Sequence, residues 1–359
     1  MTGKNYFNLL INSQTLSYDK QTWITMNESY GGVFLYNQPE VIMEQYDLEV
    51  GKITKGRGAY ICETDQGMKL LKEFRGSEER AEFLAVILAR FLGSGFEVEQ
   101  IFRDKEGKAL VTEDTGDRFI LKDMIRGTEC STKNRDEMKA AMRLLAHFHN
   151  VSASLGQEIP EFMKNGENEL AQLYAKHNRE LVKVKNYVRS KRKKNEFEMK
   201  FQKQYAHFIE NAQKTLEKLV DSDLPEGCRM LCHGDCNQHN IVYTENGWRM
   251  IHFEYMGYHA AVQDIANFMR KMLEKNGWNS RLGEELITSY ESERMLQKEE
   301  RRQLCLALAY PEKFWKLANH YYNSHKAWLS GRNIEKLDKV IEQEEERMRF
   351  LQNLFSFHG

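Results

Sequence analysis

The sequence predicts an α+β fold of two parts, a small antiparallel β-sheet with one helix followed by a larger helical region. Short β-like runs separated by turn residues fill the beginning of the chain. Long stretches with apolar residues at three- and four-residue spacing fill most of the remainder. A doubly wound sheet would instead need strands and helices that alternate regularly. We therefore expect a β-rich part over residues 1–124 and an α-rich part over 125–359.

The composition excludes several classes of function. The chain has 359 residues, of which 41% are hydrophobic, and a formal net charge of -1. Because its charges balance, we expect neither nucleic acid nor an anionic membrane as the main partner. No apolar run is long enough to span a membrane, and the start of the chain lacks a signal-peptide stretch. The six cysteines do not suggest a disulfide framework, which is consistent with a cytoplasmic protein.

The first part consists of expected strands joined by tight turns, with one inserted helix. The turn Asp65-Gln66-Gly67 separates two apolar runs and predicts a hairpin. The helix is expected over 77–92, because Ser77 is a good N-cap and the apolar residues after it have helical spacing. The expected strands lie at 41–42, within 49–64, and at 68–74, 98–102, 109–112 and 119–125.

The second part is predicted to be mostly helical, with strands only within residues 230–251. Long helices are expected at 134–150, 167–220, 260–275, 282–308 and 333–355. The basic run Lys191-Arg192-Lys193-Lys194 lies inside one of them, and a solvated helix face explains it most simply. A docking patch for an acidic partner is the alternative.

A glycine-containing turn and a strand lysine could hold nucleotide phosphates. Gly56 and Gly58 would let the backbone approach a phosphate, and Lys72 ends the apolar strand that follows. Lys69 is a competitor, but Lys72 stands closer to the end of the strand. A carboxylate of the next helix would orient the lysine, and we favour the third of three candidates, Glu78, Glu79 and Glu82.

A second segment could supply a base and a metal ligand. His233-Gly234-Asp235 follows an apolar strand, and Asn240 stands five residues after Asp235, before the next strand. This spacing places a carboxylate and an amide oxygen on one tight loop. The carboxylate can accept a proton from a hydroxyl, and the amide can bind a metal ion, as phosphoryl transfer requires.

These residues resemble the aminoglycoside phosphotransferase and choline kinase superfamily, and within it the CotS-type spore-coat kinase-like proteins. The branch is indicated by ETDQG at 63–67, KRKKNEF at 191–197 and FMRK at 268–271. The resemblance covers nearly the whole chain and implies a two-lobed, protein-kinase-like fold. It also implies ATP between the lobes, with Lys72 on its phosphates and the backbone of 123–125, from Asp123 to Ile125, as the hinge. It makes Asp235 the base and Asn240 a ligand of Mg²⁺ or Mn²⁺.

The metal loop departs from the superfamily pattern. Asp-Phe-Asp or a close relative is expected, but this chain has His252-Phe253-Glu254. Magnesium prefers oxygen ligands, whereas imidazole suits softer metals. If a metal binds here, we expect Asn240, His252 and Glu254 to hold it, with Glu254 replacing the lost carboxylate. A purely structural role for Glu254 within the loop is the alternative.

Three further groups have structural explanations beside functional ones. Asp264 is expected to cap the helix over 260–275, and the resemblance adds a hydrogen bond that steadies the catalytic loop. Cys228, Cys232 and Cys236 lack the paired spacing of a structural zinc site and are expected to be buried thiols. An aromatic set could line an acceptor pocket but is expected to be core: Tyr310, Phe314, Trp315, Tyr321, Tyr322 and Trp328.

Two functions follow from these observations. The first is transfer of the ATP γ-phosphoryl group to a hydroxyl of a small molecule whose identity the sequence does not encode. The second is a catalytically degraded kinase fold that binds other proteins or has a structural role in the spore coat. The ordered series from Lys72 to Asn240 favours the enzyme, and His252 favours the degraded fold.

Overall fold

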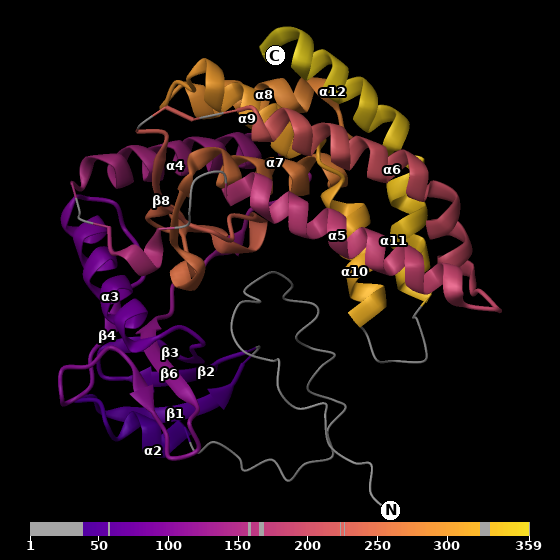
Figure 1. Ribbon diagram of the computed structural model, residues 1–359. Helices are drawn as coiled ribbons and strands as arrows, with labels where there is room; N and C mark the ends of the chain where they lie inside the picture. The colour runs from indigo at the N-terminus through magenta and orange to yellow at the C-terminus, as the bar shows by residue number, and fades with distance from the viewer. Residues whose placement is uncertain are drawn as a thin grey trace, which may run out of the picture. The chain divides into compact units, whose positions relative to one another are not determined.

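The computed structural model describes residues 39–56, 58–156, 159–164, 169–222, 224–225, 227–323 and 331–358 (Figure 1). Its largest sheet is antiparallel, with strand order β1-β2-β3-β6-β4 and with β5 also paired to β6. The helix α3 lies between β3 and β4 in sequence and beside this sheet in Figure 1. The elements of this part are α2 (Pro39–Met43), β1 (Val50–Lys55), β2 (Tyr60–Thr64), β3 (Gly67–Glu73), α3 (Glu78–Gly93), β4 (Ile101–Phe102), β5 (Val111–Thr112) and β6 (Arg118–Asp123).

Local sequence explains the turn and the helix start in this part. The predicted hairpin is confirmed, since Gly67 has φ +88° and pairs with Thr64 across the β2–β3 turn. The Thr64 hydroxyl donates to the Gly67 carbonyl at 2.7 Å and closes the turn. Ser77 caps α3 as expected, because its side chain accepts a hydrogen bond from the Arg80 amide. The expected strand at 41–42 is wrong, because these residues belong to α2, which begins at Pro39, a favoured first helical residue.

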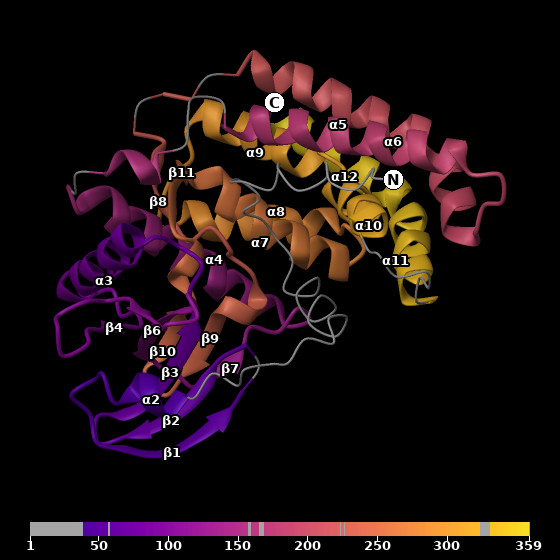
Figure 2. The same cartoon turned by 60° about the horizontal axis from the view of Figure 1, so that its bottom comes forward.

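The remaining chain is mainly helical and carries two small antiparallel sheets. β8 pairs with β11, and β9 lies between β10 and β7, as the turned view in Figure 2 shows. The helices are α4 (Arg135–Ser154), α5 (Glu169–Ser190), α6 (Glu196–Val220), α7 (Ala261–Lys275), α8 (Ser280–Glu291), α9 (Lys298–Ala309), α10 (Glu312–Asn323), α11 (Gly331–Glu342) and α12 (Glu344–His358). The strands are β7 (Thr128–Glu129), β8 (Arg229–Cys232), β9 (Ile241–Thr244), β10 (Gly247–Met250) and β11 (Gly257–Ala260).

Several expected helices are in fact pairs of shorter ones. The basic run at 191–194 is not a helix face, because it forms the connection between α5 and α6. Asn195 ends this connection with a capping box, in which its side chain and that of Glu198 each bond the other's amide. Gln297 and Glu300 form the same motif at the start of α9 and separate it from α8. Residues 333–355 likewise divide between α11 and α12.

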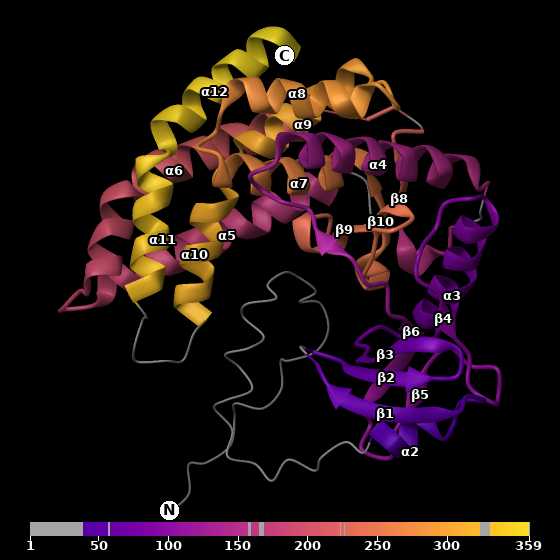
Figure 3. The ribbon, with the colours of Figure 1, turned by 180° about the vertical axis from the view of Figure 1, so that it is seen from behind.

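One hydrophobic core joins the sheet to the helical part. It contains Leu84 and Leu88 of α3, Ile120 of β6, Phe148 of α4 and the loop residue Phe253. Seen from behind in Figure 3, α4 runs beside α8 and β8, against which it packs. The loop that follows β10 is therefore fixed between elements from both parts of the chain.

A second core holds the aromatic residues of the helical part. Tyr310, Phe314, Trp315 and Tyr321 are buried there among α5, α6 and α10, which confirms that they are core. Tyr322 is exposed, and Trp328 lies outside the described residues. None of the described helices is both long and apolar enough to cross a membrane.

Candidate functional site

The loop after β8 depends on a glycine that packs against a second loop. Gly234 has φ +78°, and a Cβ built on it would lie 2.1 Å from the Tyr255 carbonyl oxygen. A larger residue is therefore excluded by both backbone conformation and contact. This close approach holds His233-Gly234-Asp235 against the short 3-10 turn Phe253–Tyr255.

Asp264 of α7 holds the same loop in place. Its carboxylate is buried in the first turn of α7 and accepts hydrogen bonds from the His233 amide at 2.6 Å and the Gly234 amide at 3.0 Å. Burial alone would raise the pKa of Asp264, but His149, whose Nε2 lies 3.5 Å from Oδ2, and the His233 amide lower it below its usual range. The expectation that Asp264 caps the helix is wrong, because Ala260 occupies the N-cap position. The loop-steadying hydrogen bond implied by the resemblance is present.

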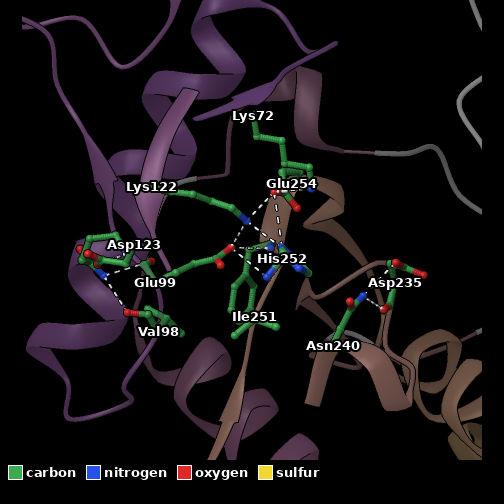
Figure 4. A network of polar contacts seen from close by, with 12 residues as sticks. Lys72, Val98, Glu99, Lys122, Asp123, Asp235, Asn240, Ile251, His252 and Glu254 are labelled. Atoms are coloured by element: carbon green, nitrogen blue, oxygen red, sulfur yellow. Dashed lines mark hydrogen bonds and ion pairs between the residues drawn. The ribbon is translucent and has the colours of Figure 1, made fainter. Parts of the chain in front are cut away.

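Asp235 and Asn240 point toward each other, as Figure 4 shows. The Asn240 side-chain amide donates to Asp235 Oδ2 at 2.8 Å and to its carbonyl oxygen at 2.7 Å. Asn237 donates to the other carboxylate oxygen, Oδ1, at 2.9 Å. Because a carboxylate only accepts hydrogen bonds, the NH₂ group of Asn240 must face it. The loop thus presents an oriented, half-buried carboxylate, which is what a general base requires.

The second loop begins in an unusual conformation. His252 follows β10 by two residues and has φ +70°, in the left-handed region that non-glycine residues seldom adopt. The amides of His252 and Phe253 both donate to Glu99 Oε1, at 2.8 and 3.1 Å. Glu99 comes from the segment just before β4, so a carboxylate from the β-rich part holds this loop in place.

Lys122 lies at the centre of the site. Its ammonium contacts Glu254 Oε1 at 2.5 Å, Glu99 Oε1 at 2.8 Å and His252 Nδ1 at 2.9 Å (Figure 4). The side chain is only 1% exposed. Burial alone would lower the pKa of Lys122, but the charges of Glu254 and Glu99 raise it above its ordinary value. The lysine therefore stays protonated.

Lys72 completes an interlobe cluster, which we define as Lys72, Glu99, Lys122, His252 and Glu254. Its ammonium lies 2.8 Å from Glu254 Oε1, the same oxygen that Lys122 binds. Burial lowers the pKa of Lys72, although the charge of Glu254 opposes this shift. Burial also disfavours the charged form of Glu254, yet the Lys122 and Lys72 charges hold its pKa well below the usual range.

The expected pairing of Lys72 with Glu82 is wrong. Glu82 instead accepts hydrogen bonds from the Arg103 side chain and the Ala109 amide. The buried face of α3 includes Ala81 and Leu84, and Glu82 is offset from both around the helix. Its carboxylate therefore meets the 103–109 segment, and Glu254, which is 182 positions away from Lys72 in sequence, takes the partner role.

The other residues predicted to bind nucleotide lie in the β1–β2 connection and at or just after the end of β6. Gly56 and Gly58 lie in the β1–β2 connection, where the Gly56 amide bonds the Ala59 carbonyl and Gly58 has φ +73°. Asp123 holds Lys69 at 2.9 Å, so Lys72 rather than Lys69 is the lysine of β3 that contacts Glu254. Ile125 follows β6 and is half-buried. The roles given to these residues in nucleotide binding stay predictions.

Sequence reasoning missed three residues of the site. Lys122 carried a signal, because it directly follows the apolar run Phe119-Ile120-Leu121 within the strand expected over 119–125. Glu99 gave a weaker signal beside Val98. Arg80 of α3 also binds the second loop, donating to the Met256 carbonyl at 2.5 Å and to the Glu254 carbonyl at 3.2 Å.

Comparison with known proteins decides the family. Residues 39–354 match the model of the family described as "Spore coat putative kinase YutH". The chain belongs to this family. It is also 23% identical to spore coat protein S of Bacillus subtilis strain 168 over 309 residues. This aligned region covers 83% of this chain and 87% of that relative. The resemblance to spore-coat kinase-like proteins is therefore confirmed.

Solved structures confirm the kinase-like phosphotransferase fold for this member of the spore coat kinase family. The aminoglycoside phosphotransferase of Alicyclobacillus acidocaldarius is similar, with a TM-score of 0.76 and 17% identity over 90% of this chain and 98% of that chain. Amicoumacin kinase hAmiN, solved with AMP-PNP and Ca²⁺, has a TM-score of 0.60 and 14% identity over 88% of this chain and 94% of that chain. At these identities the likeness shows the fold alone.

The fold implies a divalent metal ion beside Asn240 and residue 252, and the donor atoms present here do not fit one. His252 offers imidazole in place of a carboxylate, and its Nδ1 already accepts a hydrogen bond from Lys122. Glu254 Oε1 is bound by two ammonium groups. A magnesium ion would therefore have to compete with lysine side chains for the atoms expected to hold it.

Proposed function

We propose that this member of the spore coat kinase family is a kinase-fold protein without metal-dependent phosphotransfer, which acts as a binding or structural protein of the spore coat. The observation that carries the proposal is the contact of the Lys122 ammonium with His252 Nδ1 at 2.9 Å. The relative named spore coat protein S supports the association with the coat. The donor set of this chain supports the absence of metal-dependent chemistry, because Lys122 and Lys72 bind the atoms that would hold the ion.

Charge balance supports the same proposal. The interlobe cluster contains two lysines, two glutamates and a histidine that accepts a hydrogen bond through Nδ1, so its ring is neutral. The cluster is therefore close to neutral without any added ion. A divalent cation would leave an excess of two positive charges in a largely buried place, which is electrostatically unfavourable.

A second candidate function is ATP-dependent phosphorylation of a hydroxyl on a small molecule. Two observations favour it. Asn240 orients Asp235 by a hydrogen bond, and Glu254 Oε2 is buried and accepts no hydrogen bond from the described residues. In this case Asp235 would accept the proton of the acceptor hydroxyl, and Lys72 would bind nucleotide phosphates. Residues 1–124 would form the nucleotide-binding lobe and residues 125–359 the catalytic and acceptor-binding lobe.

Thermal unfolding with nucleotide and metal separates the two functions. Wild-type protein and His252→Asp are titrated with ATP and either Mg²⁺ or Mn²⁺, and ATP turnover is followed over a panel of hydroxylated acceptors. For the wild type we expect no metal-dependent rise in melting temperature and no ATP turnover above that of the Asp235→Asn variant. A metal-dependent rise in His252→Asp alone would support the loss of a metal site. Turnover by wild type that Asp235→Asn abolishes would overturn the proposal in favour of the enzyme.

A further inference from the structure

The Lys122 ammonium is completely satisfied by acceptors from two segments of the chain. A lysine ammonium has three hydrogens to donate. Lys122 has three acceptors within 2.9 Å, namely Glu99 Oε1, Glu254 Oε1 and His252 Nδ1. Figure 4 shows its side chain extending from β6 to these groups, with Glu99 on one side and the second loop on the other. The ammonium thus occupies a place built by the surrounding acceptors.

The three acceptors are also a set of metal ligands. Two carboxylate oxygens and an imidazole nitrogen, all within 4.8 Å of one another, are atoms that could hold a metal ion. Zn²⁺ binds such ligands at about 2.0–2.2 Å. An ion within that distance of Glu99, His252 and Glu254 would lie where the Lys122 ammonium now lies, because each acceptor is 2.5–2.9 Å from its Nζ. The ion and the ammonium therefore exclude each other.

The charge of the lysine serves the same purpose as that of an ion. Glu99 and Glu254 have side chains that are 3% and 9% exposed, and two carboxylates buried this close together need a positive charge between them. The cation of this site is covalently attached through the side chain of β6, so it cannot dissociate. Its presence does not depend on the concentration of metal ions around the protein.

We propose that Lys122 is a built-in cation that replaces a divalent metal ion among Glu99, His252 and Glu254, and that shortening this side chain creates a metal site. The ligand chemistry of that site is two carboxylates and one imidazole, which suits Zn²⁺ and Co²⁺ better than Mg²⁺. This inference rests on the proposed loss of metal-dependent chemistry, and it adds the residue that takes the place of the metal.

The test is a titration of nucleotide-free protein with Co²⁺, which reports its own coordination through visible absorption. The titration compares wild type, His252→Ala, Lys122→Ala and the double variant Lys122→Ala/His252→Ala. Lys52→Ala, on the exposed face of β1, is the control. We expect one equivalent of Co²⁺ on Lys122→Ala and none on wild type or Lys52→Ala. Adding His252→Ala should weaken binding by more than the roughly 10- to 100-fold lost with an outer-shell partner.

Two results would overturn the inference. One is a folded Lys122→Ala protein that does not bind Co²⁺. The other is wild-type protein that binds one equivalent of Co²⁺ and loses it with His252→Ala, a result that overturns the inference even where Lys122→Ala does not fold. The proposed function fails on a different result, ATP turnover by the wild type. The two failures are therefore distinguishable.

Discussion

Replacing Lys122 with methionine tests the electrostatic account of the interlobe cluster. Methionine keeps most of the length and volume of the side chain, so the change removes mainly the charge and its hydrogen bonds. Glu99 and Glu254 would then remain buried, at 3% and 9% side-chain exposure, without the ammonium between them. Lys72 would still hold Glu254, but Glu99 would keep, among the donors of the described residues, only two backbone amides.

The expected cost follows from the burial of these groups. Removing one partner of a buried ion pair destabilises proteins by about 3–5 kcal/mol, because the remaining charge is uncompensated. With an unfolding entropy of about 2.1 cal/mol/K per residue, a chain of this size should lose roughly 4–7 °C in melting temperature. Lys52→Met, which makes the same substitution at an exposed residue of β1, should change the melting temperature little.

Thermal and urea-induced unfolding at neutral pH measure this difference. A double-mutant cycle with Glu254→Gln isolates the pair, and we expect Lys122→Met to cost about 0.5–3 kcal/mol less in the Glu254→Gln background. If Lys122→Met unfolds within about 0.5 kcal/mol of the wild type, the ammonium does not stabilise the buried carboxylates and the reasoning is refuted.

Three further predictions concern the loop and the second core. Gly234→Ala should destabilise the protein more than Gly107→Ala in thermal unfolding. Both glycines have positive φ, but only at Gly234 would an added Cβ lie against a carbonyl oxygen. Equal effects of the two substitutions would contradict this packing argument. Asp264→Asn should lower the free energy of unfolding by about 2–4 kcal/mol, because the asparagine side chain offers one acceptor oxygen where two backbone amides donate. An unchanged free energy in urea unfolding would count against the role of Asp264 as an anchor. Burial lowers the pKa of His177, stacked on Trp315, to about 4. The unfolded chain takes up this proton near pH 6.5, so the wild type should lose about 3 kcal/mol between pH 6.5 and 4, and His177→Phe should remove that loss; an unchanged pH profile would show that other groups cause it.

Local patterns predicted the elements that local chemistry determines. The Gly67 hairpin and the Ser77 cap lie where turn and cap residues indicate. The division between α5 and α6 was also readable, because Asn195 and Glu198 have the spacing of a capping box. The apolar residues keep their helical spacing on both sides of this box, which is why periodicity alone predicts one helix over 167–220.

The candidate site was predictable only as two separate loops. The spacing of Asp235 and Asn240 indicated a shared loop, and the structure brings them together. The partners of Lys72 and Lys122 could not be read in the same way, because Glu254 lies far from both in sequence and tertiary packing alone joins them. A buried lysine needs an acceptor, but the sequence shows neither that Lys122 is buried nor which residue accepts its hydrogen bonds.

The most direct test of the central claim is the binding of Mn²⁺ by the wild-type protein. Free Mn²⁺ is followed by electron paramagnetic resonance as protein is added, with and without ATP. If the Lys122 ammonium fills the place of the metal ion, the free Mn²⁺ signal should follow that of buffer, or of ATP alone, at every protein concentration. One equivalent of protein-bound Mn²⁺ that disappears in His252→Ala would contradict the claim.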